Sequence, residues 1–153
     1  MFKTALRAAA LSLIAVAAAA PAMAQNANGT IQLRGNVQLS CTISVQDQGQ
    51  SLNLKNGENQ KTVGSVTENC NSGSGYKITL ASANSGKLKS GNTTIDYQVN
   101  YDNQGGALTS QMVVDRATAQ FNKRADLKVT VPASEQYVAG DYADTITVTI
   151  AAK

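Results

Sequence analysis

The stretch that most constrains this chain lies between residues 27 and 41, where apolar and polar residues alternate. Ile31, Leu33, Val37 and Leu39 stand at every second position, and Gly35 fills the one gap in that row. Because successive side chains of an extended strand point to opposite faces, this pattern predicts a strand with one apolar and one polar face. Such a strand needs a partner that buries its apolar face.

The first 24 residues have the pattern of a cleaved secretory signal peptide. Lys3 and Arg7 give a positive start, the apolar run Ala8–Ala20 follows, and Ala22-Met23-Ala24 has the small residues of a cleavage site. The alternative is a membrane anchor, but the run covers only about 13 residues, whereas a spanning helix needs ~20. We therefore expect a mature chain that begins at Gln25, carries no membrane span and forms one domain.

Charge argues against a nucleic-acid partner. The chain has 13 basic and 10 acidic residues, and removal of the signal peptide takes away Lys3 and Arg7, which leaves 11 against 10. The remaining basic residues are scattered, with Lys123-Arg124 the one adjacent pair after the signal. A nucleic-acid surface would show a basic cluster or stripe.

The two cysteines, Cys41 and Cys70, are expected to form a structural disulfide, because the signal sends the chain to an oxidising compartment. A metal pair or a catalytic thiol is the alternative, but the chain has no histidine, which excludes a Cys–His zinc site and a Cys–His nucleophile. No nucleophile elbow, phosphate loop or paired-carboxylate motif is visible. The sequence therefore predicts no catalytic residue, no metal, no cofactor and no enzymatic activity.

Beyond Cys41 the chain reads as a series of short strands separated by turns. The alternation predicts strands near residues 41–45, 63–70, 76–82, 94–101, 125–131 and 142–150, with shorter pieces near 52–54 and 108–114. Only residues 116–124 could form a helix, and they have no apolar stripe. Turn signals every eight to twelve residues are typical of an all-β sandwich of the immunoglobulin type.

Two further groups of residues allow two interpretations each. Tyr97, Tyr101 and Tyr142 could stack on carbohydrate, but core packing with hydroxyls at the rim is the expected role. Asp141 and Asp144 could belong to a calcium loop, but regularly spaced oxygen ligands are missing, so a turn before the last strand is favoured.

These residues resemble a known family. The stretch Gly29-Thr30-Ile31-Gln32-Leu33-Arg34-Gly35-Asn36-Val37, leading to Cys41, resembles the N-terminal extension of chaperone–usher pilins. Three later segments are similar to the archaic, spore coat U-like branch of that family: Cys70–Leu80, the tyrosine-rich Ile95–Tyr101, and the stretch from Gly140-Asp141-Tyr142 to Ile150.

The resemblance implies an incomplete immunoglobulin-like sandwich that lacks its final strand and is completed by a donor strand from another chain. Residues 25–40 would be the N-terminal extension and 41–153 the pilin β-sandwich domain, with Ile31, Leu33, Gly35, Val37 and Leu39 as the inserted row. The implied partners are identical or related pilin subunits, a periplasmic chaperone and an outer-membrane usher. The implied location is a cell-surface fimbria of a Gram-negative bacterium, reached by secretion through the periplasm.

Two alternatives remain at this stage. Residues 29–39 could be the ordinary first strand of a complete sandwich, with Gly35 marking a bulge. The whole chain could also be a self-contained secreted β-sandwich binding module, such as an adhesin domain or an inhibitor.

Overall fold

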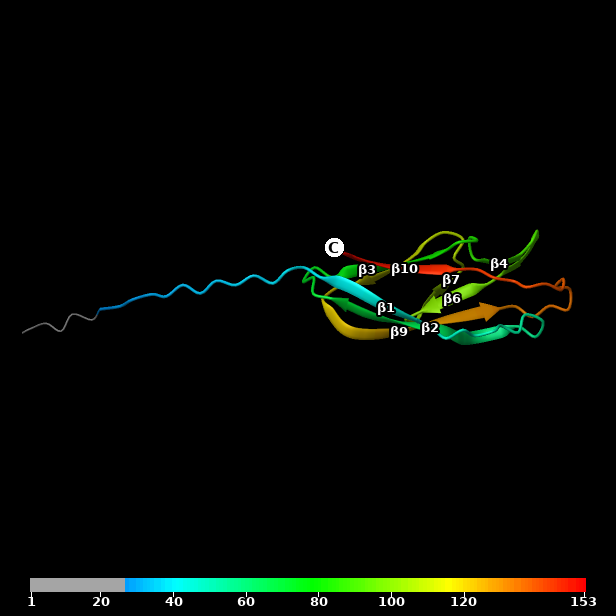
Figure 1. The fold of residues 1–153 in the computed structure, drawn as a ribbon, viewed down its shortest axis with the longest axis horizontal. Coiled ribbons are helices and arrows are strands. Elements are labelled where there is room, and N and C mark those ends of the chain that lie inside the picture. Colours follow the sequence, from blue (N-terminus) through cyan, green and yellow to red (C-terminus); the bar gives the residue numbers. More distant parts are fainter. Residues whose placement is uncertain (1–26) are drawn as a thin grey trace, which may run out of the picture. The chain divides into compact units, whose positions relative to one another are not determined.

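The computed structural model describes residues 27–153, so the expected signal peptide over residues 1–24 lies outside the described part of the chain. The described residues contain ten strands and no helix, which confirms the expected all-β class. No helix in this range is long and apolar enough to span a membrane. The chain divides into two units, residues 1–35 and 36–153. In the first, the described residues have no regular secondary structure, and all strands belong to the second (Figure 1).

The larger sheet has five antiparallel strands in the order β1-β2-β9-β6-β7. Their bounds are Cys41–Asp47 (β1), Glu58–Cys70 (β2), Gln120–Val131 (β9), Gln98–Tyr101 (β6) and Gln104–Gly106 (β7). The smaller sheet has three antiparallel strands in the order β10-β3-β8. Their bounds are Ile146–Ala152 (β10), Tyr76–Ser82 (β3) and Met112–Arg116 (β8). A separate hairpin joins Lys87–Ser90 (β4) to Thr93–Asp96 (β5).

The core lies between the five-stranded and the three-stranded sheet and is built from alternate residues of their strands. In β3, Tyr76, Ile78 and Leu80 are fully buried, while the intervening Lys77 is exposed. The larger sheet contributes a matching inward row from β2, β6 and β9, and the main contributors are Val66, Val99, Tyr101, Leu127, Val129 and Val131. The period-2 pattern read in the sequence is therefore the pattern that fills this two-layer sandwich.

The expected strand over residues 94–101 is two strands, which is a correction to the sequence analysis. The break falls at Tyr97, whose N–H donates to the carbonyl of Gly86 at 3.2 Å. Before this residue the chain pairs within the β4–β5 hairpin, and after it β6 pairs with β9 in the larger sheet. Alternation continues through the break because Ile95, Tyr97 and Val99 are all buried, so the pattern alone could not reveal it.

Other boundaries also differ from the prediction. Residues 52–54 form no strand, the final strand begins at Ile146, and residues 116–124 are the end of β8 and the start of β9. Strands β4 and β7 were missed, because β4 has four residues and β7 has three, and Gly/Asn-rich turns flank them. A strand this short owes its existence to its sheet partner and carries little local signal.

Candidate functional site

The candidate functional site lies between the free edges of the two sheets. β1 and β10 each end the order of their sheet, and the two strands lie next to one another (Figure 1). Cys41 at the start of β1 is opposite Cys70, and Ala152 at the end of β10 is opposite Tyr76. Only a short loop joins Cys70 to Tyr76, so β1 starts at the end of the sandwich where β10 finishes. The two strands therefore run antiparallel.

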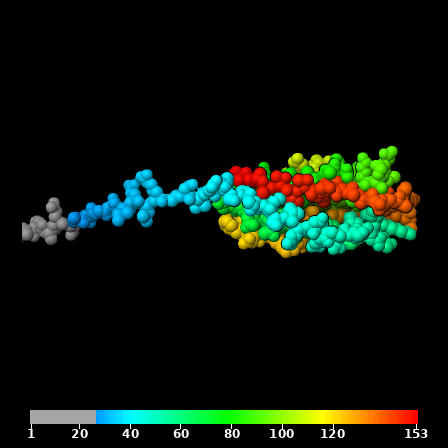
Figure 2. All heavy atoms as spheres, in the orientation of Figure 1, coloured from blue at the N-terminus to red at the C-terminus, as the bar shows by residue number. Residues whose placement is uncertain are grey.

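A groove opens between these two edges, and we call it the β1–β10 groove. Its volume is about 620 Å³. Figure 2 shows the orange and red residues of the C-terminal segment along one side of it and the cyan to teal residues around β1 along the other. The apolar side chains in its wall that pack on the core but stay partly accessible are Leu52, Leu54, Val63, Tyr142, Ile146 and Val148. Val45 is 55% exposed beside them.

The backbone along both edges has hydrogen-bonding capacity that the sheets do not use. Asn71 donates to the carbonyl of Ser40, and Gln48 donates to the carbonyl of Val63, so the even-numbered residues of β1 bond towards β2. Alternation turns the N–H and C=O groups of Ile43 and Val45 to the opposite edge.

The same argument holds for β10. Ala83 donates to the carbonyl of Thr145, and Lys153 donates to that of Gly75, so odd-numbered residues bond towards β3. The backbone groups of Ile146, Val148 and Ile150 then point to the open edge. The groove thus combines an apolar floor with two rows of backbone donors and acceptors, which are the requirements for adding a strand.

The structure joins Cys41 and Cys70 as a disulfide at the end of the sandwich where β1 begins. The pair is directly opposed in the β1–β2 register, with Cα atoms 4.0 Å apart. Cys70 is buried and belongs to the core. The first residue of β1 is therefore linked covalently to the last residue of β2.

The expected donor row lies outside every sheet of the described chain. Residues 27–40 belong to no strand, so they are not the ordinary first strand of a complete sandwich. Ile31, Leu33 and Val37 are 90%, 92% and 84% exposed, and Leu39 is 60% exposed. Around Gly35 a Cβ atom would meet nothing within 4 Å. Large apolar side chains with this exposure are unusual unless they meet a partner.

The comparison of the sequence with protein families bears on this arrangement. The model of the Spore Coat Protein U domain family matches residues 24–149, which includes the exposed apolar row, the disulfide and nearly all of the sandwich. The chain belongs to this family. The match confirms the expected resemblance to the spore coat U-like branch of the chaperone–usher pilins.

Among solved structures, a minor tip subunit of the E. coli Hda pilus is similar to this Spore Coat Protein U domain chain. The identity is 11% and the TM-score is 0.38, over 71% of this chain and 79% of the pilus subunit. The chain has no match among curated proteins.

Asp144 lines the groove just before β10 and holds this part of the chain in place. Its Oδ2 accepts hydrogen bonds from Tyr97 Oη at 2.6 Å and Ser82 Oγ at 2.5 Å. Its Oδ1 accepts from the backbone N–H groups of Asn84 at 3.0 Å and Thr145 at 2.7 Å. All of these partners are protein groups, but the expected turn before the last strand is not found here, because Ala143 forms a β-bridge with Lys89. Within residues 27–153, no cluster of three or more potential metal-binding side chains is found.

The three tyrosines pack in or against the core, as expected, but the hydroxyl of Tyr101 bonds to the fully buried Glu68 and does not reach the rim. Tyr97 and Tyr101 are buried, and their hydroxyls donate to Asp144 and Glu68. Tyr142 is partly accessible in the groove wall, and its hydroxyl donates to the carbonyl of Val138 at 2.8 Å. The rings of Tyr97 and Tyr101 therefore lie in the core, and the ring of Tyr142 packs against the core from the groove wall.

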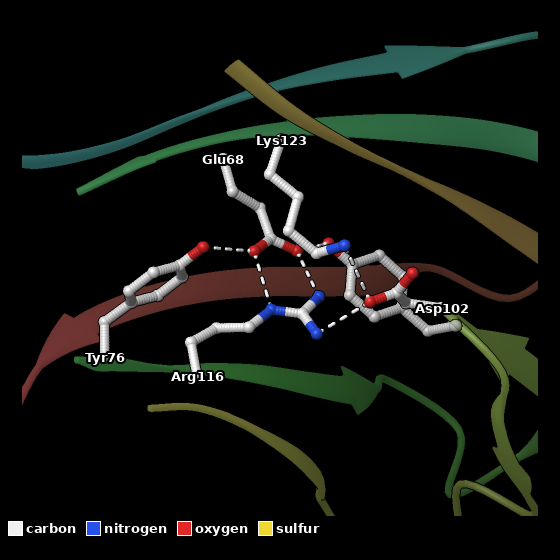
Figure 3. A network of polar contacts seen from close by, with 6 residues as sticks. Glu68, Tyr76, Asp102, Arg116 and Lys123 are labelled. Carbon is white, nitrogen blue, oxygen red and sulfur yellow. Dashed lines mark hydrogen bonds and ion pairs between the residues drawn. The ribbon is translucent and has the colours of Figure 1, made fainter. Parts of the chain in front are cut away.

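The sequence analysis did not identify the buried polar network around Glu68, drawn in Figure 3. The Glu68 carboxylate is fully buried and accepts from Arg116 Nε at 2.9 Å and Arg116 Nη2 at 2.7 Å. It also accepts from the hydroxyls of Tyr76 and Tyr101, both at 2.6 Å. A second carboxylate, Asp102, contacts Arg116 Nη1 at 2.7 Å. Lys123 Nζ completes the network at 3.0 Å from Asp102.

The network sets the charge of its members. Burial alone would raise the pKa of Glu68, but the hydrogen bonds from Arg116, Tyr101 and Tyr76 outweigh it and hold that pKa below its ordinary value. Burial and then the Glu68 carboxylate raise the pKa values of Tyr76 and Tyr101. The sequence signal was a lone glutamate in an otherwise apolar inward row of β2, between Val66 and Cys70.

Proposed function

We propose that this chain is a structural pilus subunit that polymerises by donor-strand exchange. The apolar row of residues 31–39 enters the β1–β10 groove of a second copy or a related subunit and supplies the missing strand. A periplasmic chaperone fills the groove until that exchange, and an outer-membrane usher assembles the fibre at the cell surface. Residues 1–24 are then the signal peptide, 25–40 the donor extension and 41–153 the pilin domain.

The observation that carries this proposal is that one chain has both an exposed apolar row outside its sheets and an apolar groove between two sheet edges. The groove has an apolar floor and two edges of backbone groups, and the extension offers alternate apolar side chains on an extended backbone. Burial of Ile31, Leu33, Val37 and Leu39 at ~1.5–3 kcal/mol each is worth about 6–12 kcal/mol before ordering costs. Gly35 falls in the same row and is proposed to occupy the point of the groove with the least room.

One direction of insertion would place successive subunits head to tail. Each subunit's own extension leaves at Cys41, the end of the sandwich where β10 finishes. A donor strand antiparallel to β10 would enter its acceptor with Leu39 near the start of β10, at the opposite end. The bodies of successive subunits would then stack head to tail, and such a heterologous contact forms an open fibre because it does not close on itself.

The family membership supports a structural rather than a catalytic role, since the resemblance is to a branch of pilins. The alternative of a self-contained secreted binding module predicts a stable monomer in which the extension is dispensable. The two functions differ in one observable property, which is polymer formation that depends on the apolar row.

The test compares four chains exported from their own N-terminal segment together with the chaperone and usher of the native host. They are the full chain, a chain lacking residues 25–39, Leu33→Asp on the apolar face and Gln32→Asp on the polar face. Samples are run on SDS gels with and without boiling. We expect a ladder of heat-sensitive multimers in the full chain and in Gln32→Asp.

The same ladder should be absent from the truncation and from Leu33→Asp, because a carboxylate in the apolar row cannot be buried without a partner. A monomer in all four chains would overturn the proposal in favour of the secreted binding module. Equal ladders in Gln32→Asp and Leu33→Asp would also overturn it, because the apolar row would then not be inserted.

A further inference from the structure

Asn71 holds the base of the extension with three hydrogen bonds. Its side-chain Oδ1 accepts from the backbone N–H of Ser40 at 2.7 Å, and its Nδ2 donates to the carbonyl of Gln38 at 2.7 Å. Its own backbone N–H donates to the carbonyl of Ser40 at 3.1 Å. The residue follows β2 directly, just beyond the disulfide-linked Cys70.

These contacts act in place of a paired strand. In an extended segment the C=O of residue 38 and the N–H of residue 40 point to the same edge, where a neighbouring strand would normally bond both. An asparagine amide carries one acceptor and one pair of donors, so a single side chain satisfies both groups. The β1–β2 pairing is thereby prolonged by one residue pair, Ser40 with Asn71. The hydrogen bond from the Asn71 side-chain amide to the carbonyl of Gln38 extends it further.

Along residues 38–40, only one of the two backbone edges is hydrogen-bonded within the chain. At residues 38–40, the edge that faces Asn71 is already used by the chain's own sandwich. The N–H and C=O of Leu39 point to the other edge. We infer that Asn71 is a positioning residue that fixes the direction in which the extension leaves the sandwich and thereby sets the angle between successive subunits. This inference rests on the proposed function, because it assigns Asn71 a role in the polymer formed by strand insertion.

The mechanism is a restriction of hinge motion. A donor strand seated in the groove of the next subunit is held there by its own side chains and backbone. The remaining freedom between two subunits lies in the few residues that join that strand to β1. Asn71 bonds to Gln38 inside the apolar row and to Ser40 between that row and β1, so that the inserted strand and the donor's body turn together.

The test uses the full chain, Asn71→Ala, Asn71→Asp and a matched control, Asn69→Ala. Asn69 is a neighbouring asparagine whose Oδ1 accepts from the backbone N–H of Asn122 at 2.8 Å, away from the extension. Purified fibres are imaged by negative-stain electron microscopy for the angle between successive subunits. Amide hydrogen exchange is measured at Ser40, and heat-sensitive ladders are quantified on gels.

We expect Asn71→Ala to give the wild-type amount of ladder, with a wider spread of inter-subunit angles. Exchange at the Ser40 amide should be about tenfold faster, as expected for the loss of the one hydrogen bond of ordinary strength that this N–H donates to Asn71 Oδ1. Asn71→Asp keeps the acceptor for Ser40 but loses the donor to Gln38, so its angles should be intermediate. It also provides the test if Asn71→Ala does not fold. Asn69→Ala should match the wild type.

Wild-type angles in Asn71→Ala, or in Asn71→Asp if Asn71→Ala does not fold, would overturn the inference while the ladder still supports strand exchange. A folded Asn71→Ala chain that forms no ladder would also overturn it, because Asn71 would then be needed for insertion itself. Absence of a ladder in the wild-type chain would instead be a failure of the proposed function.

Discussion

The guanidinium of Arg116 and the carboxylate of Glu68 form a two-point hydrogen-bonded ion pair in the interior of the sandwich, at 2.9 and 2.7 Å. Glu68 comes from the larger sheet and Arg116 from the last position of β8 in the smaller one. The pair therefore links the two layers across the core. Its energetic value depends on both partners, because a buried charge without its partner is strongly unfavourable.

Removal of one partner of the Glu68–Arg116 pair should lower the stability of the fold. We expect Glu68→Ala to lower the free energy of unfolding by about 3–5 kcal/mol, since it leaves the Arg116 charge without its main partner. The exposed pair Lys55–Glu135 provides the control, and Lys55→Ala should cost less than about 1 kcal/mol. Urea unfolding followed by circular dichroism measures both. Equal effects of the two changes would contradict the assignment of Glu68 as a buried, paired charge.

Acid should weaken the sandwich through the same network. The pKa values of Glu68 and Asp102 lie below their ordinary values of 4.5 and 3.8, because hydrogen bonds from Arg116 and Lys123 outweigh the effect of burial. A carboxylate with a depressed folded-state pKa adds stability above its unfolded pKa and loses it as the pH falls. The urea midpoint should therefore fall as the pH drops below about 4.5.

The matched comparison for this pH dependence is Glu68→Gln. It cannot ionise, so its urea midpoint should change less steeply over the same acidic range, although it starts from a lower value. A variant with the wild-type slope would place the acid sensitivity in other carboxylates.

Asp144 should contribute more to the stability of the fold than its neighbour Asp141 does. Asp144 accepts four hydrogen bonds, three of which join the chain before β10 to Tyr97, to the end of β3 and to the turn after β3, whereas Asp141 is exposed. Hydrogen bonds to a charged group are worth about 1.5–3 kcal/mol each, and relaxation recovers part of the loss. We expect Asp144→Ala to destabilise the chain by about 2–4 kcal/mol in urea unfolding and Asp141→Ala to change little. Similar effects of both changes would contradict the role of Asp144.

A second copy of the donor row, attached after Lys153, should fill the groove within one chain. β10 finishes beside Gly75, so a tight turn after Lys153 would bring residues 29–39 back antiparallel to β10. We expect this chain to be a monomer with no heat-sensitive ladder and a higher melting temperature than the unmodified monomer. The control carries Asp in place of Leu33 in the added copy. A modified chain that still polymerises would argue against this groove as the acceptor.

Two complementary variants should form dimers and nothing larger. Leu33→Asp has a defective donor and an intact groove, and Val148→Arg has an intact donor and a blocked groove. Coexpressed, the extension of Val148→Arg should enter the groove of Leu33→Asp and stop there. The control Thr147→Arg changes an exposed neighbour in β10 and should leave the ladder intact. A long ladder from the mixed pair would contradict insertion of the apolar row into the groove that Val148 lines.

Some features were predictable because they depend on neighbours in the sequence. The all-β class, the inward rows of β3 and β10 and the amphipathic row of residues 31–39 follow from side-chain alternation, which is a local property. The strand ends at residues 76 and 82 were predicted correctly because Gly/Ser-rich turns bound that strand on both sides. The start of the final strand was misplaced because Tyr142 is in phase with the apolar row that begins at Ile146, where pairing with β3 starts.

By itself, the sequence determined which residues alternate, that Cys41 and Cys70 are its two cysteines, and that residues 31–39 carry an apolar row without an obvious partner. Only the tertiary structure decided that β1 and β10 are the free edges, that a groove lies between them, and that Glu68, Arg116 and Tyr101 meet in the core. The physical reason is range. Alternation acts between adjacent residues, whereas strand order and buried ion pairs depend on sheet register between segments far apart in the chain.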